Sequence, residues 1–221
     1  MKNFLFVGNS FTYFNDLPQL IQLIADPDKK EYDLVSVTKG GASLEEFAFP
    51  SERRERFLFK LEWKKWDGLI LQENGIYPAT HLEKTLPAAK ILANDASCQT
   101  YFYQTWSYLD GSEKLASTGM GYEEFYQKLK DGYHELAKSC NGIVVPVGDG
   151  FAYMHAHYPD VNLYRDDCFH PNIYGSYLSA LIFARVLFGC DIMDAWSPKE
   201  IDGDNRAALI EAALAATQEY K

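Results

Sequence analysis

Five short apolar segments, separated by longer amphipathic ones, constrain the fold more than any other feature of the sequence. Each is about as long as a β-strand, and none contains a charged residue. Strands with apolar residues on both faces are typical of a parallel sheet that helices cover on both sides. The five segments are residues 4–7, 34–37, 68–71, 100–103 and 143–147.

The segments between them carry the periodicity and the capping signals of helices. Asp16 precedes an apolar stripe, and Ser43 followed by Glu46 matches a capping box. Pro87 is expected to kink or restart its helix, and Pro171 is expected to occupy the first position of a long apolar helix. Helices are predicted after Asp16, from residue 43 up to Pro50, and over residues 51–61, 80–96, 121–139, 171–188 and 205–220.

This order of elements predicts an α/β fold, a three-layer α/β/α sandwich around a central, mostly parallel sheet of about five strands. The sequence has no internal repeat, linker or low-complexity tract, so one domain is expected over residues 1–221. Ligands of such sheets bind beyond the carboxyl ends of the strands, so the residues directly after each strand are the candidates for function.

The segment Gly8-Asn9-Ser10-Phe11-Thr12 follows the first predicted strand. Gly8 permits a tight turn, and Ser10 would then face the carboxyl edge of the sheet. A serine in this place is either a nucleophile or an ordinary helix cap. A nucleophilic serine needs a base beside it, because its hydroxyl is not deprotonated at neutral pH.

His170 is the candidate base among the five histidines. Asp167 lies three residues upstream, so a short loop would bring its carboxylate to the imidazole and fix the tautomer. Asp166 is an alternative to Asp167 as the carboxylate that contacts His170. The non-catalytic alternative for the whole segment is a cluster of residues that cap the following helix. His155 and His157 would point about 200° apart on a helix, and no metal site is expected. His81 and His134 lie in charged helical segments and are expected at the surface.

Acyl transfer also requires hydrogen-bond donors for the oxyanion that develops. Gly40 and Gly41 follow the second predicted strand, and either would offer a backbone N–H. Asn74 follows the third strand, and its side-chain amide would offer another donor. The ordinary alternatives are a strand-to-helix turn at the glycines and an Asn-Gly turn at Asn74 and Gly75.

Taken in chain order, these residues resemble the motifs of the SGNH hydrolase superfamily, also called GDSL-type esterases and lipases. Its first block, usually Gly-Asp-Ser, corresponds to residues 8–10, and its second-block glycine corresponds to Gly41. Its fifth block, Asp-x-x-His, is residues 167–170. The resemblance extends from Gly8 to about Gly189.

The chain departs from the family pattern at two blocks. Asn9 replaces the usual Asp of the first block. In the third block, usually Gly-x-Asn-Asp, Asn74 matches, whereas Gln72 stands for Gly and Gly75 for Asp. Together with the segments Leu-Gln-Glu-Asn and His-Pro-Asn, these departures resemble one poorly characterised branch of the superfamily.

The resemblance implies a flavodoxin-like α/β fold and a serine hydrolase that acts on carboxylic esters without a cofactor or a metal. It implies that Ser10 is the nucleophile, that His170 is the general base, and that Asp167 orients His170. The oxyanion hole would consist of the backbone N–H groups of Ser10 and Gly41 with the side-chain amide of Asn74.

The substrate is expected to be a short-acyl ester, with acetyl groups on a carbohydrate as the leading candidate. Gln104 and Trp106 follow the fourth strand, and an amide beside an aromatic ring suits stacking on sugars, although packing explains it equally well. Glu73 is a further candidate near the site, either for a salt bridge or for contact with a substrate hydroxyl. The alternatives are a thioesterase or lysophospholipase of the same fold and a catalytically silent α/β binding module. A flavodoxin-like nucleotide binder is disfavoured, because the first turn is a poor phosphate loop.

The acidic charge of the chain disfavours two classes of partner. The 21 basic and 31 acidic residues give a net charge of −10. Nucleic acids and anionic membranes favour cationic surfaces, so neither is expected as a partner. The resemblance implies a small-molecule or carbohydrate ester as the partner. The four cysteines form no C-x-x-C pair, and no run of 18 apolar residues occurs. No signal peptide is visible, which predicts a cytoplasmic protein, or an exported one if a leader has been removed.

Overall fold

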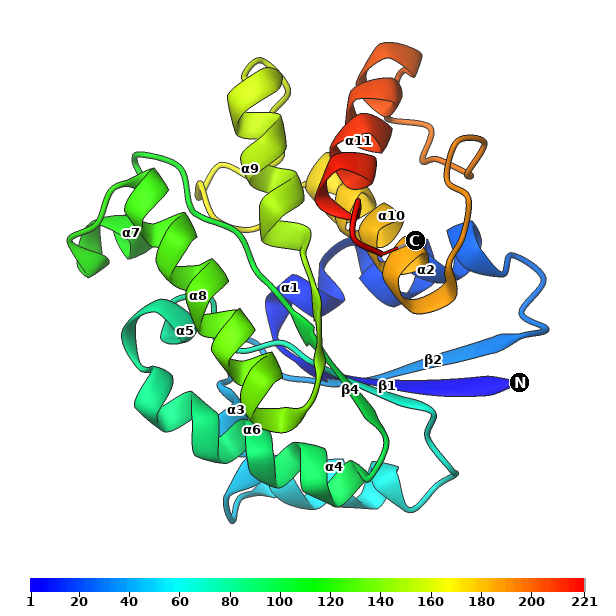
Figure 1. Ribbon diagram of the computed structural model, residues 1–221, viewed down its shortest axis with the longest axis vertical. Coiled ribbons are helices and arrows are strands. Elements are labelled where there is room, and N and C mark those ends of the chain that lie inside the picture. Colours follow the sequence, from blue (N-terminus) through cyan, green and yellow to red (C-terminus); the bar gives the residue numbers. More distant parts are fainter. Residues whose placement is uncertain (221) are drawn as a thin grey trace.

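The computed structural model describes residues 1–220, in which strands and helices alternate along the chain (Figure 1). In this part of the chain five strands form one sheet in the order β2-β1-β3-β4-β5, and every neighbouring pair is parallel. The predicted α/β fold with a mostly parallel sheet of about five strands is therefore confirmed. The strands are β1 (Lys2–Gly8), β2 (Tyr32–Thr38), β3 (Gly68–Leu71), β4 (Gln99–Tyr103) and β5 (Ile143–Val145).

The register of the central strands brings their carboxyl ends to one level. Val7 of β1 lies opposite Val37 of β2 on one side and opposite Leu71 of β3 on the other. All three side chains are buried, as expected for strands covered on both faces. The order of strands reverses direction at β1, so the loops after β1 and β3 meet at the switch point where ligands of such sheets bind.

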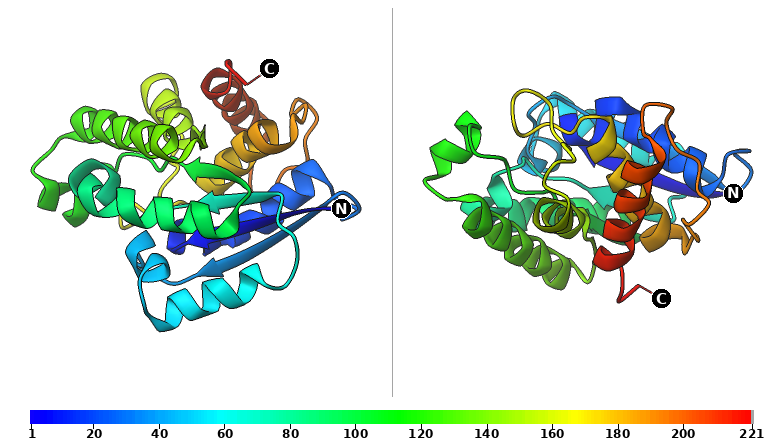
Figure 2. Two further views of the ribbon diagram at one scale, coloured as in Figure 1. Left: turned by 60° about the horizontal axis from the view of Figure 1, so that its bottom comes forward. Right: turned by 90° about the horizontal axis from the view of Figure 1, so that it is seen from above.

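Helices cover both faces of the sheet, and the two views of Figure 2 show the same layers. Short α7 (Glu113–Thr118) lies beside α8 (Tyr122–Cys140). One layer contains α1 (Ser10–Tyr13), η1 (Phe14–Asp16), α2 (Leu17–Ala25), α9 (Val147–His157), α10 (Ile173–Phe188) and α11 (Gly203–Ala216). The other contains α3 (Leu44–Ala48), α4 (Glu52–Leu61), α5 (Tyr77–Thr80), α6 (Leu82–Ala96) and α8 (Tyr122–Cys140).

Helix α10 is the central helix of its layer. Its residues from Gly175 to Ala184 are all buried, and the ring of Phe183 packs against Phe6 of β1 and Tyr103 of β4. Its long apolar sequence therefore reflects packing on the sheet. No helix within residues 1–220 has both the length and the apolar character that crossing a membrane requires.

The predicted helix caps are confirmed. The Asp16 side chain accepts a hydrogen bond from the backbone N–H of Gln19 at the start of α2. Ser43 and Glu46 form the capping box at the start of α3. Their side chains accept hydrogen bonds from backbone N–H groups that have no partner within the first helical turn.

The structure differs from the predictions at three prolines. Strand β5 ends at Val145, because Pro146 has no N–H to donate to the sheet, and Val147 already belongs to α9. Helix α6 continues through Pro87, whose missing N–H removes only the bond to the carbonyl of Glu83 near the start of the helix. Pro171 precedes the N-cap of α10 instead of opening the helix.

Four α-helices, α1, α5, α7 and α9, were not predicted, and α11 was predicted too long. Helix α9 contains Gly148 and Gly150, which weaken its helical signal, and α7 has only six residues. Helix α11 ends at Ala216, short of the predicted residue 220.

Strand β5 forms one edge of the sheet and is only three residues long. The C-terminal segment lies against it, and the hydroxyl of Tyr220 donates a hydrogen bond of 2.7 Å to the carbonyl of Val144. One edge of the sheet is thus covered by the end of the described chain.

A close approach between α5 and α8 fixes the loop that follows β3. An added Cβ at Gly132 of α8 would lie well inside van der Waals distance of the backbone carbonyl oxygen of Pro78 in α5. Backbone atoms cannot move aside as a flexible side chain does, so the contact requires glycine.

We expect Gly132→Ala to lower the free energy of unfolding by about 1–2 kcal/mol, because overpacking against Pro78 outweighs the better helix propensity of alanine. Urea denaturation measures this difference. Gly203→Ala is the matched control, because an added Cβ at Gly203 in α11 meets no atom within 4 Å. Equal stability of the two variants would contradict the close approach.

Candidate active site

Ser10 and His170 meet where β1 leaves the sheet. Ser10 is the first residue of α1, and the Asn9 side chain caps this helix by accepting a hydrogen bond from Phe11 N–H. His170 Nε2 lies 2.8 Å from Ser10 Oγ, although 160 residues separate the two in sequence. The expected pairing of serine and imidazole is present in the geometry.

Asp167 fixes the orientation of His170. Its Oδ2 lies 2.6 Å from His170 Nδ1, and its Oδ1 accepts the backbone N–H groups of Phe169 at 3.2 Å and His170 at 2.9 Å. A carboxylate bonded in this way holds Nδ1 protonated and leaves Nε2 as the acceptor that faces Ser10. Asp166 makes no hydrogen bond with His170 among the described residues, so the geometry favours Asp167 of the two candidates.

The loop that carries Asp167 and His170 is held at both ends and in the middle. Arg165 N–H donates to the carbonyl of His170 at 2.9 Å, and Tyr164 pairs with Pro171 in an isolated β-bridge. The indole N–H of Trp106 donates to the carbonyl of Phe169 at 3.0 Å. Since Pro171 takes part in this bridge, α10 begins later, at Ile173.

Three phenylalanine rings and two cations surround His170. The rings of Phe14, Phe169 and Phe11 lie 4.5 Å, 4.0 Å and 5.6 Å from the imidazole, between ring centres. Lys114 Nζ lies 4.1 Å from the centre of the Phe169 ring, and Arg165 Cζ lies 5.0 Å from that of Phe14. Neither cation forms an ion pair within residues 1–220.

These surroundings favour a neutral imidazole. Burial lowers the pKa of His170 below its usual 6.5, Asp167 opposes that change, and the charges of Lys114 and Arg165 lower the pKa further. Burial opposes ionisation of Asp167, but the hydrogen bonds from His170 and Phe169 keep the pKa of that carboxyl below its usual value. At neutral pH the pair is therefore a neutral histidine beside a charged aspartate, which is the state that a general base requires.

Three backbone N–H groups near the site make no hydrogen bond within residues 1–220: those of Ser10, Gly40 and Gly41. Gly41 has a left-handed backbone, with φ of +70°, and its carbonyl accepts a hydrogen bond of 3.1 Å from Asn74 Nδ2. The turn thus joins Gly41 to the Asn74 side chain, whereas Gly40 faces the hydroxyl of Tyr13. The predicted donors Ser10, Gly41 and Asn74 follow three adjacent strands.

Asn9 and Gln72 form a buried amide pair beneath the site that the sequence reasoning missed. Asn9 N–H donates to Gln72 Oε1 at 2.9 Å, and Gln72 Nε2 donates to Asn9 Oδ1 at 3.0 Å. Asn9 Nδ2 also reaches the carbonyls of Ala42 at 3.0 Å and Glu73 at 3.3 Å. The available signal was a polar side chain directly after each of two buried strands, where an unpaired amide would be costly.

Glu73 does not lie at the surface, so the expectation that it contacts substrate was wrong. Its side chain is 0% exposed. Its Oε1 accepts the backbone N–H groups of Leu44 at 2.9 Å and Asn74 at 2.5 Å, while Oε2 has no hydrogen-bond partner among residues 1–220. Burial raises the pKa of Glu73 to about 7, although these hydrogen bonds and Thr85 oppose the shift.

Gln104 and Trp106 also turn inward, so the expectation that they contact substrate was wrong as well. Both are fully buried. Gln104 Nε2 donates to Asp149 at 2.7 Å, and the Trp106 ring stacks on Phe151 at 4.1 Å. The segment after β4 thus supports the His170 loop from below, through the indole bond to Phe169.

A cavity of about 540 Å³ opens beside the aspartate of the site. Its walls are mainly polar, and it is wide open to solvent. It is lined by Asn162, Tyr164, Arg165, Asp166, Asp167 and Asn172.

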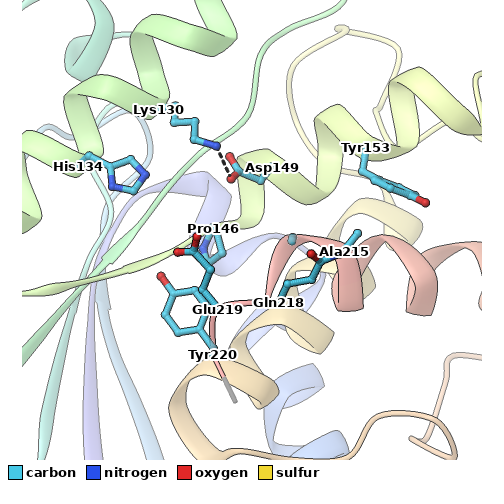
Figure 3. A pocket seen from close by; sticks show the side chains of 10 residues that line it. Lys130, His134, Pro146, Asp149, Tyr153, Ala215, Gln218, Glu219 and Tyr220 are labelled. Atoms are coloured by element: carbon cyan, nitrogen blue, oxygen red, sulfur yellow. Dashed lines mark hydrogen bonds and ion pairs between the residues drawn. The ribbon is translucent and has the colours of Figure 1, made fainter.

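A second cavity, of about 340 Å³, lies apart from these residues between α8, α9 and the C-terminal segment (Figure 3). Its main charged groups are already paired, since Lys130 Nζ lies 2.8 Å from Asp149 Oδ2. Its lining includes His134, Pro146, Tyr153, Gln218, Glu219 and Tyr220.

No group of three histidine, cysteine or acidic side chains within the described residues 1–220 is arranged to hold a metal ion. His155 and His157 lie on helix α9, where their rings stack on Tyr122 and Tyr153 respectively. The four cysteines are free thiols and are only partly buried.

We expect Lys114→Ala to raise the pKa of His170, because removing the cation removes a repulsion that disfavours the imidazolium. An NMR titration of the His170 ring protons measures this pKa without reference to activity. Lys128→Ala, which removes an exposed lysine that pairs with Glu124 on α8, is the control. An unchanged His170 pKa in Lys114→Ala would show that the lysine does not act on the imidazole.

Glu73→Gln should change how stability depends on pH. The folded state favours the protonated carboxyl, so the stability that Glu73 contributes below its usual pKa of 4.5 is lost as the pH rises through about 7. As the pH rises from 4.5 to 8, the wild type should therefore lose about 3 kcal/mol of its free energy of unfolding relative to Glu73→Gln.

Denaturant unfolding at both pH values measures this difference. Glu83→Gln, at an exposed position in α6, is the control and should keep the difference from wild type constant. Parallel stability profiles of Glu73→Gln and wild type would contradict the raised pKa.

The comparisons with known proteins agree with this geometry at the level of the fold. No protein-family model and no curated protein matches the chain. A protein from Slackia heliotrinireducens, described as a candidate SGNH hydrolase, is 26% identical, with a TM-score of 0.74 over 84% of this chain and 98% of its own. A DUF4886 family protein from Bacteroides uniformis is 17% identical, with a TM-score of 0.82 over 98% and 95%. A carbohydrate acetylesterase family member from Sinorhizobium meliloti is 13% identical, with a TM-score of 0.60 over 86% and 100%.

Proposed function

Because this chain belongs to the SGNH hydrolase superfamily, we propose that it is a serine esterase with Ser10, His170 and Asp167 as its catalytic triad. The observation that carries the proposal is the continuous chain of hydrogen bonds from Ser10 Oγ through His170 to Asp167, at 2.8 Å and 2.6 Å. A serine, an imidazole and a carboxylate in this order are the groups that activate a hydroxyl as a nucleophile.

In the proposed reaction Ser10 Oγ attacks the ester carbonyl while His170 Nε2 takes the hydroxyl proton. His170 then gives this proton to the leaving alcohol, and an acyl group remains on Ser10. Water, activated by the same imidazole, releases the acid and restores the serine. Asp167 keeps Nδ1 protonated and stabilises the imidazolium that forms twice in each cycle.

The negative charge that develops on the carbonyl oxygen requires hydrogen-bond donors. The free backbone N–H groups of Ser10 and Gly41 and the side-chain amide of Asn74 are the proposed oxyanion hole. Gly41 is favoured over Gly40 because its turn is bonded directly to Asn74.

We propose short acyl esters as substrates, with acetyl groups on a carbohydrate as the leading candidate. The fold likeness to a carbohydrate acetylesterase family member supports this choice.

We expect wild-type protein to hydrolyse p-nitrophenyl acetate faster than p-nitrophenyl octanoate, and Ser10→Ala to abolish both activities. Loss of the nucleophile in a catalytic triad costs about 10⁶-fold in kcat. A spectrophotometric assay of p-nitrophenolate release measures both esters. Octanoate preference would instead favour a lysophospholipase or thioesterase, and equal rates in wild type and Ser10→Ala would favour a binding module without turnover.

A matched pair of substitutions distinguishes the two adjacent aspartates in the same assay. Asp167→Asn should reduce kcat by about 10⁴-fold, because the amide no longer holds the required tautomer of His170. Asp166→Asn should retain activity, since Asp166 makes no bond to the imidazole. The reverse result would assign the role to Asp166.

A further inference from the structure

We propose that Glu73 is a positioning residue that holds the loops of the two oxyanion donors, Gly41 and Asn74, in place relative to one another. This inference rests on the proposed function, because it concerns the oxyanion hole of that reaction. It replaces the expected contact with substrate, which the complete burial of Glu73 does not allow.

The sheet joins the two loops only indirectly. The Gly41 loop follows β2 and the Asn74 loop follows β3, and in the sheet β1 lies between these two strands. No ladder hydrogen bond therefore connects β2 with β3. Besides β1 and the Asn9 side chain, which donates to the carbonyls of Ala42 and Glu73, direct contacts between the loops fix the distance between the two donors.

The Glu73 carboxylate provides such a link with a single oxygen. Its Oε1 accepts the backbone N–H of Leu44, three residues after Gly41, at 2.9 Å. The same oxygen accepts the backbone N–H of Asn74 at 2.5 Å. A shift of either loop would lengthen one of these bonds. The bond from Asn74 Nδ2 to the carbonyl of Gly41, at 3.1 Å, lies next to this link and connects the same two loops.

Burial of the Glu73 carboxylate lowers the stability of the fold, so packing alone does not explain a glutamate at this position. The side chain is fully buried and Oε2 has no hydrogen-bond partner within residues 1–220. A buried carboxylate with an unpaired oxygen destabilises a fold. The groups that face it are Glu45, Thr85 and the hydroxyl of Tyr133, and none is a cation. A residue kept at this cost is expected where a local geometry matters more than stability.

The position of the carboxylate also fits the departure of the third block from the family pattern. The residue after Asn74 is Gly75, where an aspartate is usual, and the acidic residue stands directly before Asn74. Glu73 therefore supplies the only carboxylate within the segment from Gln72 to Gly75.

Steady-state kinetics with p-nitrophenyl acetate tests the proposal on Glu73→Ala, Glu73→Gln and Glu73→Asp. Glu73→Ala should lower kcat by about 100- to 1,000-fold, the usual cost of one oxyanion donor, with KM changed by less than about threefold. Glu73→Gln should recover most of kcat, because its Oε1 accepts the same two N–H groups. Glu73→Asp should stay impaired, because the shorter side chain does not reach both loops.

A double mutant tests whether Glu73 acts through Asn74. If it does, Glu73→Ala combined with Asn74→Ala should have nearly the same kcat as Asn74→Ala alone, because residues that act as a unit are not additive. Gln22→Ala is the control for truncation of a buried polar side chain, since among the described residues the Gln22 side chain bonds only to Asp26, in another part of the fold. It should leave kcat unchanged.

The outcomes separate this inference from the proposed function. Loss of activity in Ser10→Ala with a nearly unchanged kcat in Glu73→Ala would overturn the role of Glu73 alone. Greater activity in Glu73→Asp than in Glu73→Gln would also overturn it, because the charge would then matter and not the reach. If Glu73→Ala does not fold, this Gln–Asp comparison decides the question. Full activity in Ser10→Ala would overturn both the esterase mechanism and the role of Glu73.

Discussion

The reciprocal hydrogen bonds between Asn9 and Gln72 hold together the ends of β1 and β3, and the geometry of the site depends on them. Both side chains are almost completely buried, so breaking the pair would leave amide groups without partners in a medium that does not solvate them. Ser10 follows Asn9 and Glu73 follows Gln72. One buried pair therefore fixes where the chain turns out of the sheet on both sides of the switch point.

The same pair explains why an amide stands where an aspartate is usual. Asn9 Nδ2 donates to the carbonyls of Ala42 and Glu73, and a carboxylate would repel both oxygens. Asn9 thus joins the loops after β1, β2 and β3 through one side chain. On the far side of the site, Trp106 supports the His170 loop in a comparable way, by donating to the carbonyl of Phe169. Ser10 is 8% exposed and His170 is half-buried, while Asn9, Gln72 and Trp106, which place them, are almost completely buried.

The sequence predicted those parts of the structure that depend on strand ends and on short spacings. Ser10, Gly41 and Asn74 follow apolar segments, and Asp167 and His170 are close enough in sequence for a short loop to join them. It could not predict the direction of side chains in the loops. The identity of a residue that follows a strand does not determine whether its side chain faces solvent or the core. Tertiary packing places Glu73, Gln104 and Trp106 in the interior. Helix α9 was not predicted from the sequence, because its two glycines have a low helix propensity.

The covering of β5 by the C-terminal segment bears on how the protein behaves at high concentration. An open sheet edge is a template on which a strand of another chain can add, and this is a common route to aggregation. Here the edge strand has three residues, and Tyr220 already occupies the carbonyl of Val144. The last described turn of the chain thus shields this edge of the sheet, and shortening the chain there would expose the carbonyl of Val144 without any change in the residues around Ser10.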